Sequence, residues 1–475
     1  MTTVPTGPTG SATRPQDLAE HVLAASATTG CVVVVSDARG AHLRWANTTL
    51  TTNGASRRLT VTVVALVESD GGTSVGSVTG SATTREQAEE VLRAAEAAAA
   101  QAGPAEDANP LLTPEQAGPA GDWEAAPATT GPETYAGLAP ALGRAFATAS
   151  AGERVLYGFV NHEVETTYLA SSSGLRLRHE QPTGHLGCTG KSADLGRSAW
   201  VGVASRDLTD VDPEAIEAEL AQRLAWAERS VDLPAGRYDV VLPPSAVADL
   251  MVDVYWGAGA RDAHEGGSVY SRRGGGTRVG EQVVDPRVTL RSDPAAPGIS
   301  SAPFVTASAS GNLSSVFDNG MPLGPTDWIR DGVLTSLLGT RHTSALTGLA
   351  TTPYVDNLVL EVEGGTGDTA DLVAGVERGL LLTCLWYIRE VDPQRMLLTG
   401  LTRDGVYLVE DGEITAAVNN FRWNESPVEI LGRFTHASAT RQSFGREWGD
   451  DYFSRTATPA LRVPDFTMSS VSQAR

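Results

Sequence analysis

The strand and helix at residues 237–257, RYDVVLPPSAVADLMVDVYWG, most constrain how this chain can fold. Residues 238–242 form a short apolar run that is typical of a buried strand. Two prolines end this strand, and the residues after them predict a helix at about 245–256. The polar residues of that helix are spaced four apart and share one face: Ser245, Asp249 and Asp253. We therefore expect a helix with one polar and one apolar face, directly after a core strand.

Residues 15–102 predict a first α+β module, preceded by a small, polar segment at 1–14 that we expect to be a disordered tail. Asn53-Gly54 predicts a tight turn between two strands. Thr84 and Gln87 form the capping box of a long helix. The expected elements, in order, are a helix at 17–26, strands at 31–37, 42–54 and 57–69, and a helix at 84–103.

A second, larger part follows a connection at 103–131 that is rich in Pro, Gly and Ala. Trp123 predicts one anchoring contact within this connection. Residues 132–235 predict a helix, a run of short strands and a further helix that Asp212 caps. Residues 236–475 predict a mainly β domain punctuated by Gly turns, interrupted by a helix at 368–379. The fold class expected is α+β: an N-terminal α+β module followed by a larger β-rich domain with a central sheet and a few helices.

The charge of the chain excludes several classes of partner. The net charge is −21, and Lys191 is the only lysine, so the chain has no polybasic patch for nucleic acid or an anionic membrane. The three cysteines lie far apart, which fits a reducing compartment better than a disulfide scaffold. The sequence starts without a charged and apolar signal segment and contains no apolar run of about 18 residues. These features predict a cytoplasmic protein.

A series of phrases in the second part resembles the TldD/TldE (PmbA) family, in the same order. FDNGMP (317–322) resembles a family turn, and DGVLTSLLGTRHTSALTG (331–348) resembles the stretch that follows it. Three further segments continue the series: 352–365, 398–414 and 419–434. The resemblance covers about 150–475, whereas the first hundred residues agree only in their helix–strand pattern. It implies a β-rich second domain with a large central sheet.

The resemblance also implies a partnership between two subunits. In TldD-like subunits a helix at this place carries the zinc motif HExxxH, and a later cysteine completes the site. The six positions that we set against the motif are 251–256, where Met251, Val252 and Trp256 offer no zinc ligand and no general base. The chain therefore resembles a TldE-like subunit with no catalytic residue and no metal of its own. A TldD-like partner would hold zinc in a heterodimer that encloses and cleaves unfolded or leader peptides.

Three other groups of residues are candidate sites. Asp249 and Asp253 can bind a hard cation or can simply form the polar face of the helix. His179, His185 and Cys188 are zinc-ligand types, although their spacing matches no zinc motif and a strand can turn them to opposite sides. The third group is a glycine-rich loop with two arginines that can grip a carboxylate or act as a flexible turn, and it is a candidate peptide or partner contact: Arg272, Arg273, Gly274, Gly275 and Gly276.

Two functions compete with that of a helper subunit. One is a stand-alone hydrolase with an unrecognised site, for which the His179, His185 and Cys188 group is the best candidate. The other is a homo-oligomeric scaffold in the maturation of peptide natural products. The sequence does not define the peptide substrate, the endo- or exopeptidase outcome or the stoichiometry.

Overall fold

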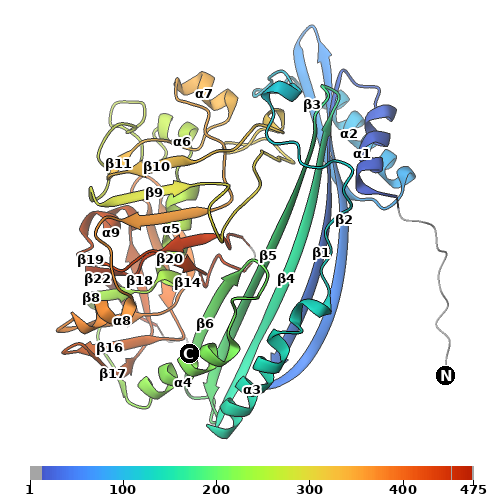
Figure 1. Cartoon of the computed structure of the whole chain (residues 1–475). Coiled ribbons are helices and arrows are strands. Elements are labelled where there is room, and N and C mark those ends of the chain that lie inside the picture. Colours follow the sequence, from blue (N-terminus) through green and yellow to red (C-terminus); the bar gives the residue numbers. More distant parts are fainter. Residues whose placement is uncertain (1–12, 451, 473–475) are drawn as a thin grey trace, which may run out of the picture.

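The computed structural model describes residues 13–450 and 452–472 of the chain. Two parts lie side by side in Figure 1: a long, curved sheet with helices along its outer face, and a β-rich body against its inner face. The expected α+β class is confirmed. Most of the expected tail at 1–14 lies outside the described residues.

The first part is a six-stranded antiparallel sheet with the order β3-β2-β1-β4-β5-β6. It crosses the expected division between 15–102 and 132–235, because β1 pairs with β4 from Val32↔Ser171 to Trp45↔Gly158. Its strands are β1 (Gly30–Ala46), β2 (Thr49–Ser69), β3 (Gly72–Ser81), β4 (Arg154–Ser171), β5 (Arg176–Ser192) and β6 (Ser198–Ser205).

Four helices cover the outer face of this sheet, two at each end (Figure 1). Their N-termini follow ordinary capping rules: Thr84 accepts a hydrogen bond from the Gln87 N–H, and Asp212 accepts from two N–H groups of its first turn. The helices are α1 (Pro15–Ala25) and α2 (Arg85–Gln101) at one end, and α3 (Leu138–Ala151) and α4 (Pro213–Trp226) at the other. A short 3-10 turn, η2 (Pro132–Tyr135), precedes α3.

The hairpin between β1 and β2 turns at Asn47 and Thr48, so the turn expected at Asn53-Gly54 is wrong. Asn47 and Thr48 have φ values of 49° and 60°, and Thr48 exchanges hydrogen bonds with the backbone of Leu156 on β4. Gly54 lies within β2 opposite His42, whose ring would be 2.7 Å from a Cβ at that position. The glycine therefore serves a close side-chain approach rather than a turn.

The second part contains two sheets with a buried helix between them. The larger has the order β14-β15-β18-β22-β8-β13-β16-β17-β7, with β19 pairing on β22, and the smaller has the order β11-β10-β9-β12-β21-β20. The larger contains β7 (Ser230–Val231), β8 (Gly236–Leu242), β13 (Arg378–Leu382), β14 (Leu385–Asp392), β15 (Leu397–Thr402), β16 (Val406–Glu410), β17 (Glu413–Val418), β18 (Phe421–Glu425), β19 (His436–Ala437) and β22 (Leu461–Val471). The smaller contains β9 (Val288–Ser292), β10 (Thr326–Arg330), β11 (Val333–Leu334), β12 (Leu358–Val362), β20 (Arg441–Ser443) and β21 (Thr456–Thr458).

The helix between the sheets is α5 (Pro244–Trp256), which confirms the strand, proline stop and helix expected at 237–257. It contacts β8 of the larger sheet and β12, β20 and β21 of the smaller one. Leu250 and Tyr255 pack in the main core with Trp328, Phe421 and Trp423. The other helices are α6 (Ala260–His264), α7 (Arg341–Thr347), α8 (Thr369–Ala374), α9 (Pro427–Arg433) and η3 (Val316–Asp318).

The helix expected at 368–379 is shorter, because α8 ends before Gly375 and β13 begins at Arg378. Gly379 is therefore a strand residue and not a helix C-cap. A Cβ on Gly379 would lie 2.4 Å from the carbonyl oxygen of Asp239 on β8. Glycine is required there because β13 and β8 pair in parallel at close range.

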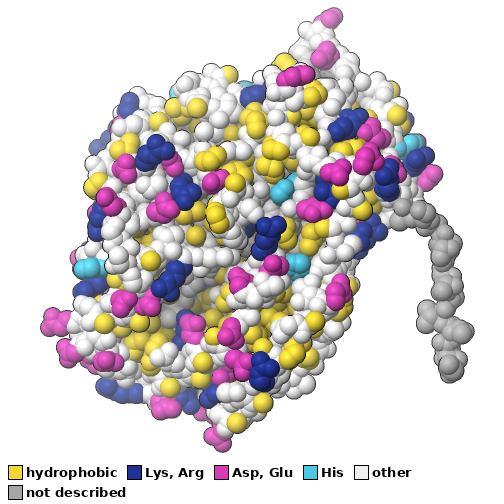
Figure 2. Space-filling model, in the orientation of Figure 1, with side chains coloured by type: hydrophobic (Ala, Val, Ile, Leu, Met, Phe, Trp, Pro, Cys, Tyr) yellow, Lys and Arg dark blue, Asp and Glu magenta, His cyan; other side chains and the backbone are white. Residues whose placement is uncertain are grey.

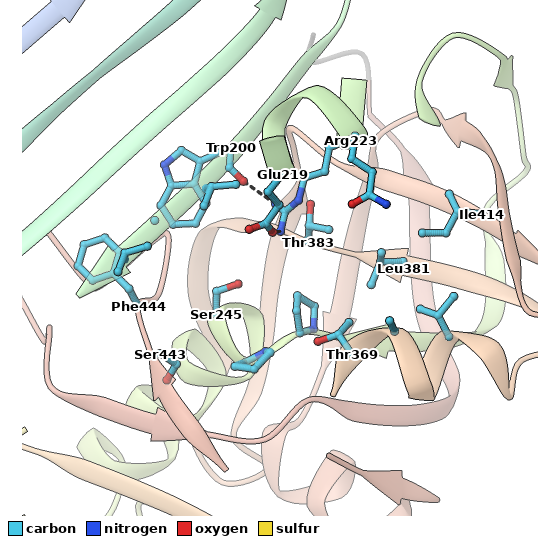
Figure 3. Close-up of a pocket in the computed structure, with 18 of the residues that line it drawn as sticks. Trp200, Glu219, Arg223, Ser245, Thr369, Leu381, Thr383, Ile414, Ser443 and Phe444 are labelled. Carbon is cyan, nitrogen blue, oxygen red and sulfur yellow. Dashed lines mark hydrogen bonds and ion pairs between the residues drawn. The ribbon is translucent and has the colours of Figure 1, made fainter. Parts of the chain in front are cut away.

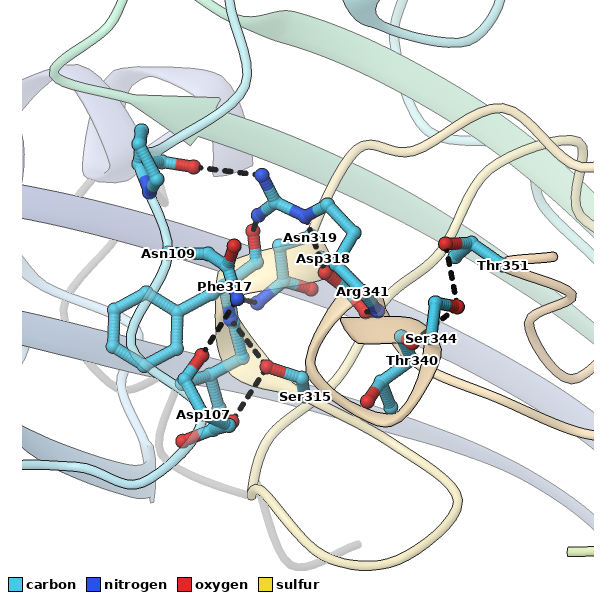
Figure 4. Close-up of polar contacts among 12 residues, drawn as sticks. Asp107, Asn109, Ser315, Phe317, Asp318, Asn319, Thr340, Arg341, Ser344 and Thr351 are labelled. Carbon is cyan, nitrogen blue, oxygen red and sulfur yellow. Dashed lines mark hydrogen bonds and ion pairs between the residues drawn. The ribbon is translucent and has the colours of Figure 1, made fainter. Parts of the chain in front are cut away.

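The connection at 103–131 is fastened to both parts of the molecule, and Figure 4 shows its polar contacts with the second part. The buried Asp318 accepts hydrogen bonds from the side chain and backbone of Arg341, and the Arg341 guanidinium also donates to the carbonyl oxygen of Pro110. Ser315 donates to Asp107 at 2.6 Å. Trp123, at the other end, packs edge-on against Tyr168 of β4. The FDNGMP segment (317–322) thus helps to hold the connection against the second part. The connection itself contains a 3-10 turn, η1 (Pro114–Gln116). No helix among the described residues is long and apolar enough to span a membrane.

Candidate functional site

A cavity of about 780 Å³ lies between the two parts of the molecule. Its walls are β6 and α4 from the first part, and the N-terminus of α5, α8, β13 and β20 from the second (Figure 3). In Figure 2 this region is a hollow with hydrophobic side chains at its floor. The apolar lining includes Trp200, Trp226, Val373, Leu381, Ile414 and Phe444, and the polar lining includes Glu219, Gln222, Arg223, Ser245, Thr369 and Gln442.

One wall of the cavity is an edge of β6 that pairs with no described strand, while its other edge pairs with β5. Arg223 donates a 2.5 Å hydrogen bond to the carbonyl oxygen of Trp200, and Gln442 donates a 3.3 Å bond to that of Ala204. Backbone groups of alternate residues face the same edge of a strand, so those of Gly202 lie between these two contacts. An extended peptide can pair with such an edge at Gly202 and extend along it.

The helix at the expected zinc-motif position does not fit a metal. Met251 and Val252 are 0 % and 1 % exposed and face the apolar core. The ring of Trp256 packs edge-on against Trp448 at 5.1 Å between centroids. Zinc sites use imidazole nitrogen, thiolate sulfur or carboxylate oxygen, and the thioether of Met251, the alkyl group of Val252 and the indole N–H of Trp256 supply none of these. Within residues 13–450 and 452–472, no group of three or more His, Cys, Asp or Glu side chains is placed to hold a metal ion.

The two carboxylates on α5 bind the segment that covers the helix. Asp249 is fully buried and accepts hydrogen bonds of 2.8–3.1 Å from the backbone N–H groups of Arg446, Glu447 and Trp448. Asp253 accepts a 3.2 Å bond from the indole N–H of Trp448. Burial raises the pKa of Asp249 to about 8, and the three N–H donors oppose that rise. The carboxylates therefore hold residues 446–448 in place, which favours the structural interpretation over a cation site.

Asp253 makes the stability of the chain depend on pH. Burial raises its pKa to about 7, and the nearby carboxylates of Glu390 and Glu447 add to the rise. The folded state therefore keeps its proton at pH values where the unfolded state, with a pKa near 4, has lost it. The contribution of Asp253 to stability is complete below about pH 4 and falls as pH rises towards 7, by at most about 1.4 kcal/mol per pH unit. Above pH 7 it levels off.

We expect Asp253→Asn to reduce this pH dependence, because an amide does not titrate and its oxygen can still accept from Trp448. The part of the slope that comes from Asp249, whose pKa burial also raises, should remain. Urea unfolding midpoints of both proteins between pH 5 and pH 8 measure the effect. Glu390→Gln, at a largely exposed neighbour, is the matched control and should leave most of the slope. An unchanged slope in the Asp253 variant would contradict the assignment.

The second candidate metal group does not converge. His179 and His185 lie on the inner face of β5, where His179 contacts Phe304 and His185 stacks on Phe444 at 5.3 Å. Cys188 lies on the outer face in the core under α3 and α4, and burial raises the pKa of its thiol to about 12. An odd and an even residue of one strand point to opposite faces, so His185 and Cys188 cannot share a metal.

The arginine–glycine loop is an exposed turn. Ser271 and Thr277 form a bridge at its base, and the glycines between them have positive φ values of 81–114° with open space around them. Arg272 pairs with Glu281 at 2.8 Å, whereas Arg273 has no ion pair with another described residue. The loop remains a prediction for a peptide or partner contact.

The structure places one cation that the sequence did not single out. Arg446 lies between Trp200 and Trp386, with its guanidinium carbon 5.0 Å and 4.4 Å from the two ring centroids. These residues are about 60 to 250 positions apart in the chain. The only signal in the sequence is the concentration of aromatic residues around 444–453, which does not identify their partners.

Comparison with known proteins shows two matches to family models. Residues 235–470 match the PmbA/TldA metallopeptidase C-terminal domain, and residues 132–228 match the central domain of the same family. A comparison with curated proteins finds no significant match.

Three solved structures are similar over nearly the whole chain. A TldE from Thermococcus kodakarensis has a TM-score of 0.74 and 17% identity, covering 93% of this chain and 96% of its own. A proposed modulator of a DNA gyrase from Thermotoga maritima has a TM-score of 0.72 and 18% identity, and the match covers 95% of this chain and 99% of that one. A proposed modulator of DNA gyrase from Bacteroides thetaiotaomicron has a TM-score of 0.72 and 15% identity, and the match covers 96% of this chain and 98% of that one. At these identities the likeness establishes the shared fold.

Proposed function

Because this chain belongs to the PmbA/TldD metallopeptidase family, we propose that it is the TldE-like, non-catalytic subunit of a two-chain zinc peptidase. One observation carries the proposal: α5 presents Met251, Val252 and Trp256 where a zinc helix would present its ligands. Zinc would be held by a TldD-like partner, and no step of the hydrolysis is assigned to residues of this chain. The net charge of −21 supports a role without nucleic acid or an anionic membrane, and the widely separated cysteines support a cytoplasmic location.

The role of the chain in this proposal is to enclose and position an unfolded or leader peptide. The cavity between the two parts offers apolar walls for side chains, and the edge of β6 along it offers backbone groups at Gly202. Pairing to a strand edge binds any extended sequence through its main chain, and pockets beside the edge add preference for side chains. A subunit of this kind supplies binding while the partner supplies the chemistry.

The proposal predicts activity only in the presence of both subunits. The full chain is mixed with a TldD-like chain that carries HExxxH, and cleavage of an unfolded casein is followed by mass spectrometry. We expect cleavage by the pair and none by this chain alone, because hydrolysis needs a metal-bound water and the proposal assigns the metal to the partner. Replacing the glutamate of the partner's motif by glutamine is the matched control and should abolish cleavage.

Two outcomes would contradict the proposal. Cleavage by this chain alone would favour a stand-alone hydrolase. A stable homodimer that does not associate with the TldD-like chain, measured by light scattering after size-exclusion chromatography, would favour a homo-oligomeric scaffold. Elemental analysis of the purified chain adds an independent check, since stoichiometric zinc would overturn the assignment of the metal to the partner.

A further inference from the structure

The guanidinium of Arg446 has no acid partner within the described residues. It is stacked between the indoles of Trp200 and Trp386, and its Nε is buried without a hydrogen-bond acceptor. Other arginines of this region are paired: Arg389 lies 3.2 Å from Glu447, and Arg403 lies 3.4 Å from Asp404. A half-buried cation that keeps a donor unpaired is costly unless a ligand completes it.

The nearest acid along the chain is committed elsewhere. Glu447 accepts hydrogen bonds from the backbone N–H groups of Tyr387 and Ile388, at 2.9 Å and 3.2 Å, and from Arg389. The backbone of Arg446 is in turn fixed by its 2.8 Å bond to the buried Asp249. The cation is therefore held in one place by its main chain and by two rings, and Glu447 does not neutralise it.

Arg446 is connected to the large cavity through the ring of Trp200. Trp200, which stacks on one side of Arg446, is also a wall of the cavity, and so is Phe444, two residues before Arg446. Figure 3 shows Trp200 and Phe444 together at the β6 end of the cavity. The two rings lie 6.3 Å apart and nearly parallel. A ligand that fills the cavity along β6 contacts Trp200 at that end, the ring on which Arg446 stacks.

We propose that Arg446, Trp200 and Trp386 form a carboxylate-binding site for a peptide in the cavity. A guanidinium presents parallel N–H donors that match the two oxygens of a carboxylate. The indoles hold its plane by cation–π contact and keep water from one face, which strengthens the ion pair. The site deepens the proposed function and rests on it for the identity of the ligand as a peptide. The carboxylate is either the C-terminus of the peptide or an Asp or Glu side chain.

Binding of short peptides to the full chain alone tests the site. Three probes are compared by calorimetry: N-acetyl-Ala-Ala-Phe with a free carboxylate, the same peptide as its amide, and N-acetyl-Ala-Asp-Phe-amide. We expect an acid probe to bind about tenfold more tightly than the neutral amide, as for one charge-assisted hydrogen-bonded pair. Tighter binding of the first probe identifies the chain terminus as the ligand group, and tighter binding of the third identifies a side chain.

Arg446→Gln should erase the advantage of the acid probe, and Arg446→Lys should restore only part of it, because lysine keeps the charge but not the planar fork. Arg85→Gln is the control for net charge, since Arg85 is an exposed residue at the start of α2, distant from the cavity. Trp386→Leu leaves the cation in place and should weaken acid binding several-fold. Circular dichroism verifies that each variant is folded.

Equal binding of acid and neutral probes by the unaltered chain would overturn the site, and so would an acid preference that survives in a folded Arg446→Gln variant. Failure of partner-dependent cleavage is a separate result, because these measurements use neither a partner nor zinc. An acid preference without such cleavage would keep the site and reject the two-chain peptidase.

Discussion

Replacing Asp249 with alanine is expected to lower the free energy of unfolding by about 4 kcal/mol. The substitution removes, from a fully buried position, the carboxylate that accepts from the backbone N–H groups of Arg446, Glu447 and Trp448. Each unpaired buried N–H costs about 1–3 kcal/mol, although relaxation of the segment recovers a part. Urea unfolding followed by tryptophan fluorescence measures the loss, and Trp448 reports directly on the segment that is released.

Two further variants test the contact from the side of Asp249 and from the side of the segment that it binds. Asp249→Asn keeps an acceptor oxygen but turns an amide N–H₂ towards a backbone N–H, so it should lose about half as much stability as the alanine variant. Gly445→Ala leaves Asp249 intact, yet a Cβ at Gly445 would lie 2.2 Å from its Oδ1, so it should loosen the same segment. An alanine variant at Asp249 that is as stable as the unaltered chain would show that the segment does not depend on this carboxylate.

Local patterns predicted those parts of the fold that depend on neighbouring residues. The strand, proline stop and helix of α5 follow from a short apolar run and two prolines. Thr84 and Asp212 were predicted as caps because a cap acts within one turn of its helix. The β1–β2 turn was misplaced because Asn47 and Thr48 are held in the left-handed region by bonds to β4, about 110 residues later.

The site depends on contacts between distant segments, and these the sequence does not specify. The absence of ligands at Met251, Val252 and Trp256 could be read directly, since it needs only the helix and the resemblance. The cavity could not, because it forms where β6 meets β20 and α8. Arg446 gains its place from Trp200 and Trp386, which come from two different sheets.

Installing the zinc motif on α5 by Met251→His, Val252→Glu and Trp256→His is expected to prevent folding rather than create a metal site. Val252 is 1 % exposed and Met251 is fully buried, so the changes place a carboxylate and an imidazole in an apolar core. The cost of burying such groups without partners is about 5 kcal/mol or more, which is comparable with the whole stability of a domain. Circular dichroism should show loss of the native spectrum, and elemental analysis of any soluble protein should show no stoichiometric zinc.

Single substitutions show which change is responsible. Val252→Ala removes the same apolar contacts without a charge and should cost only about 2 kcal/mol. Trp256→His, at the half-buried end of the helix, should lose its packing on Trp448 and remain folded. If the triple variant folds and binds one zinc ion per chain, the core around α5 is far more adaptable than its packing implies. The helix would then be a metal site that lacks only its ligands, and the helper role would rest on three side chains instead of on the architecture around them.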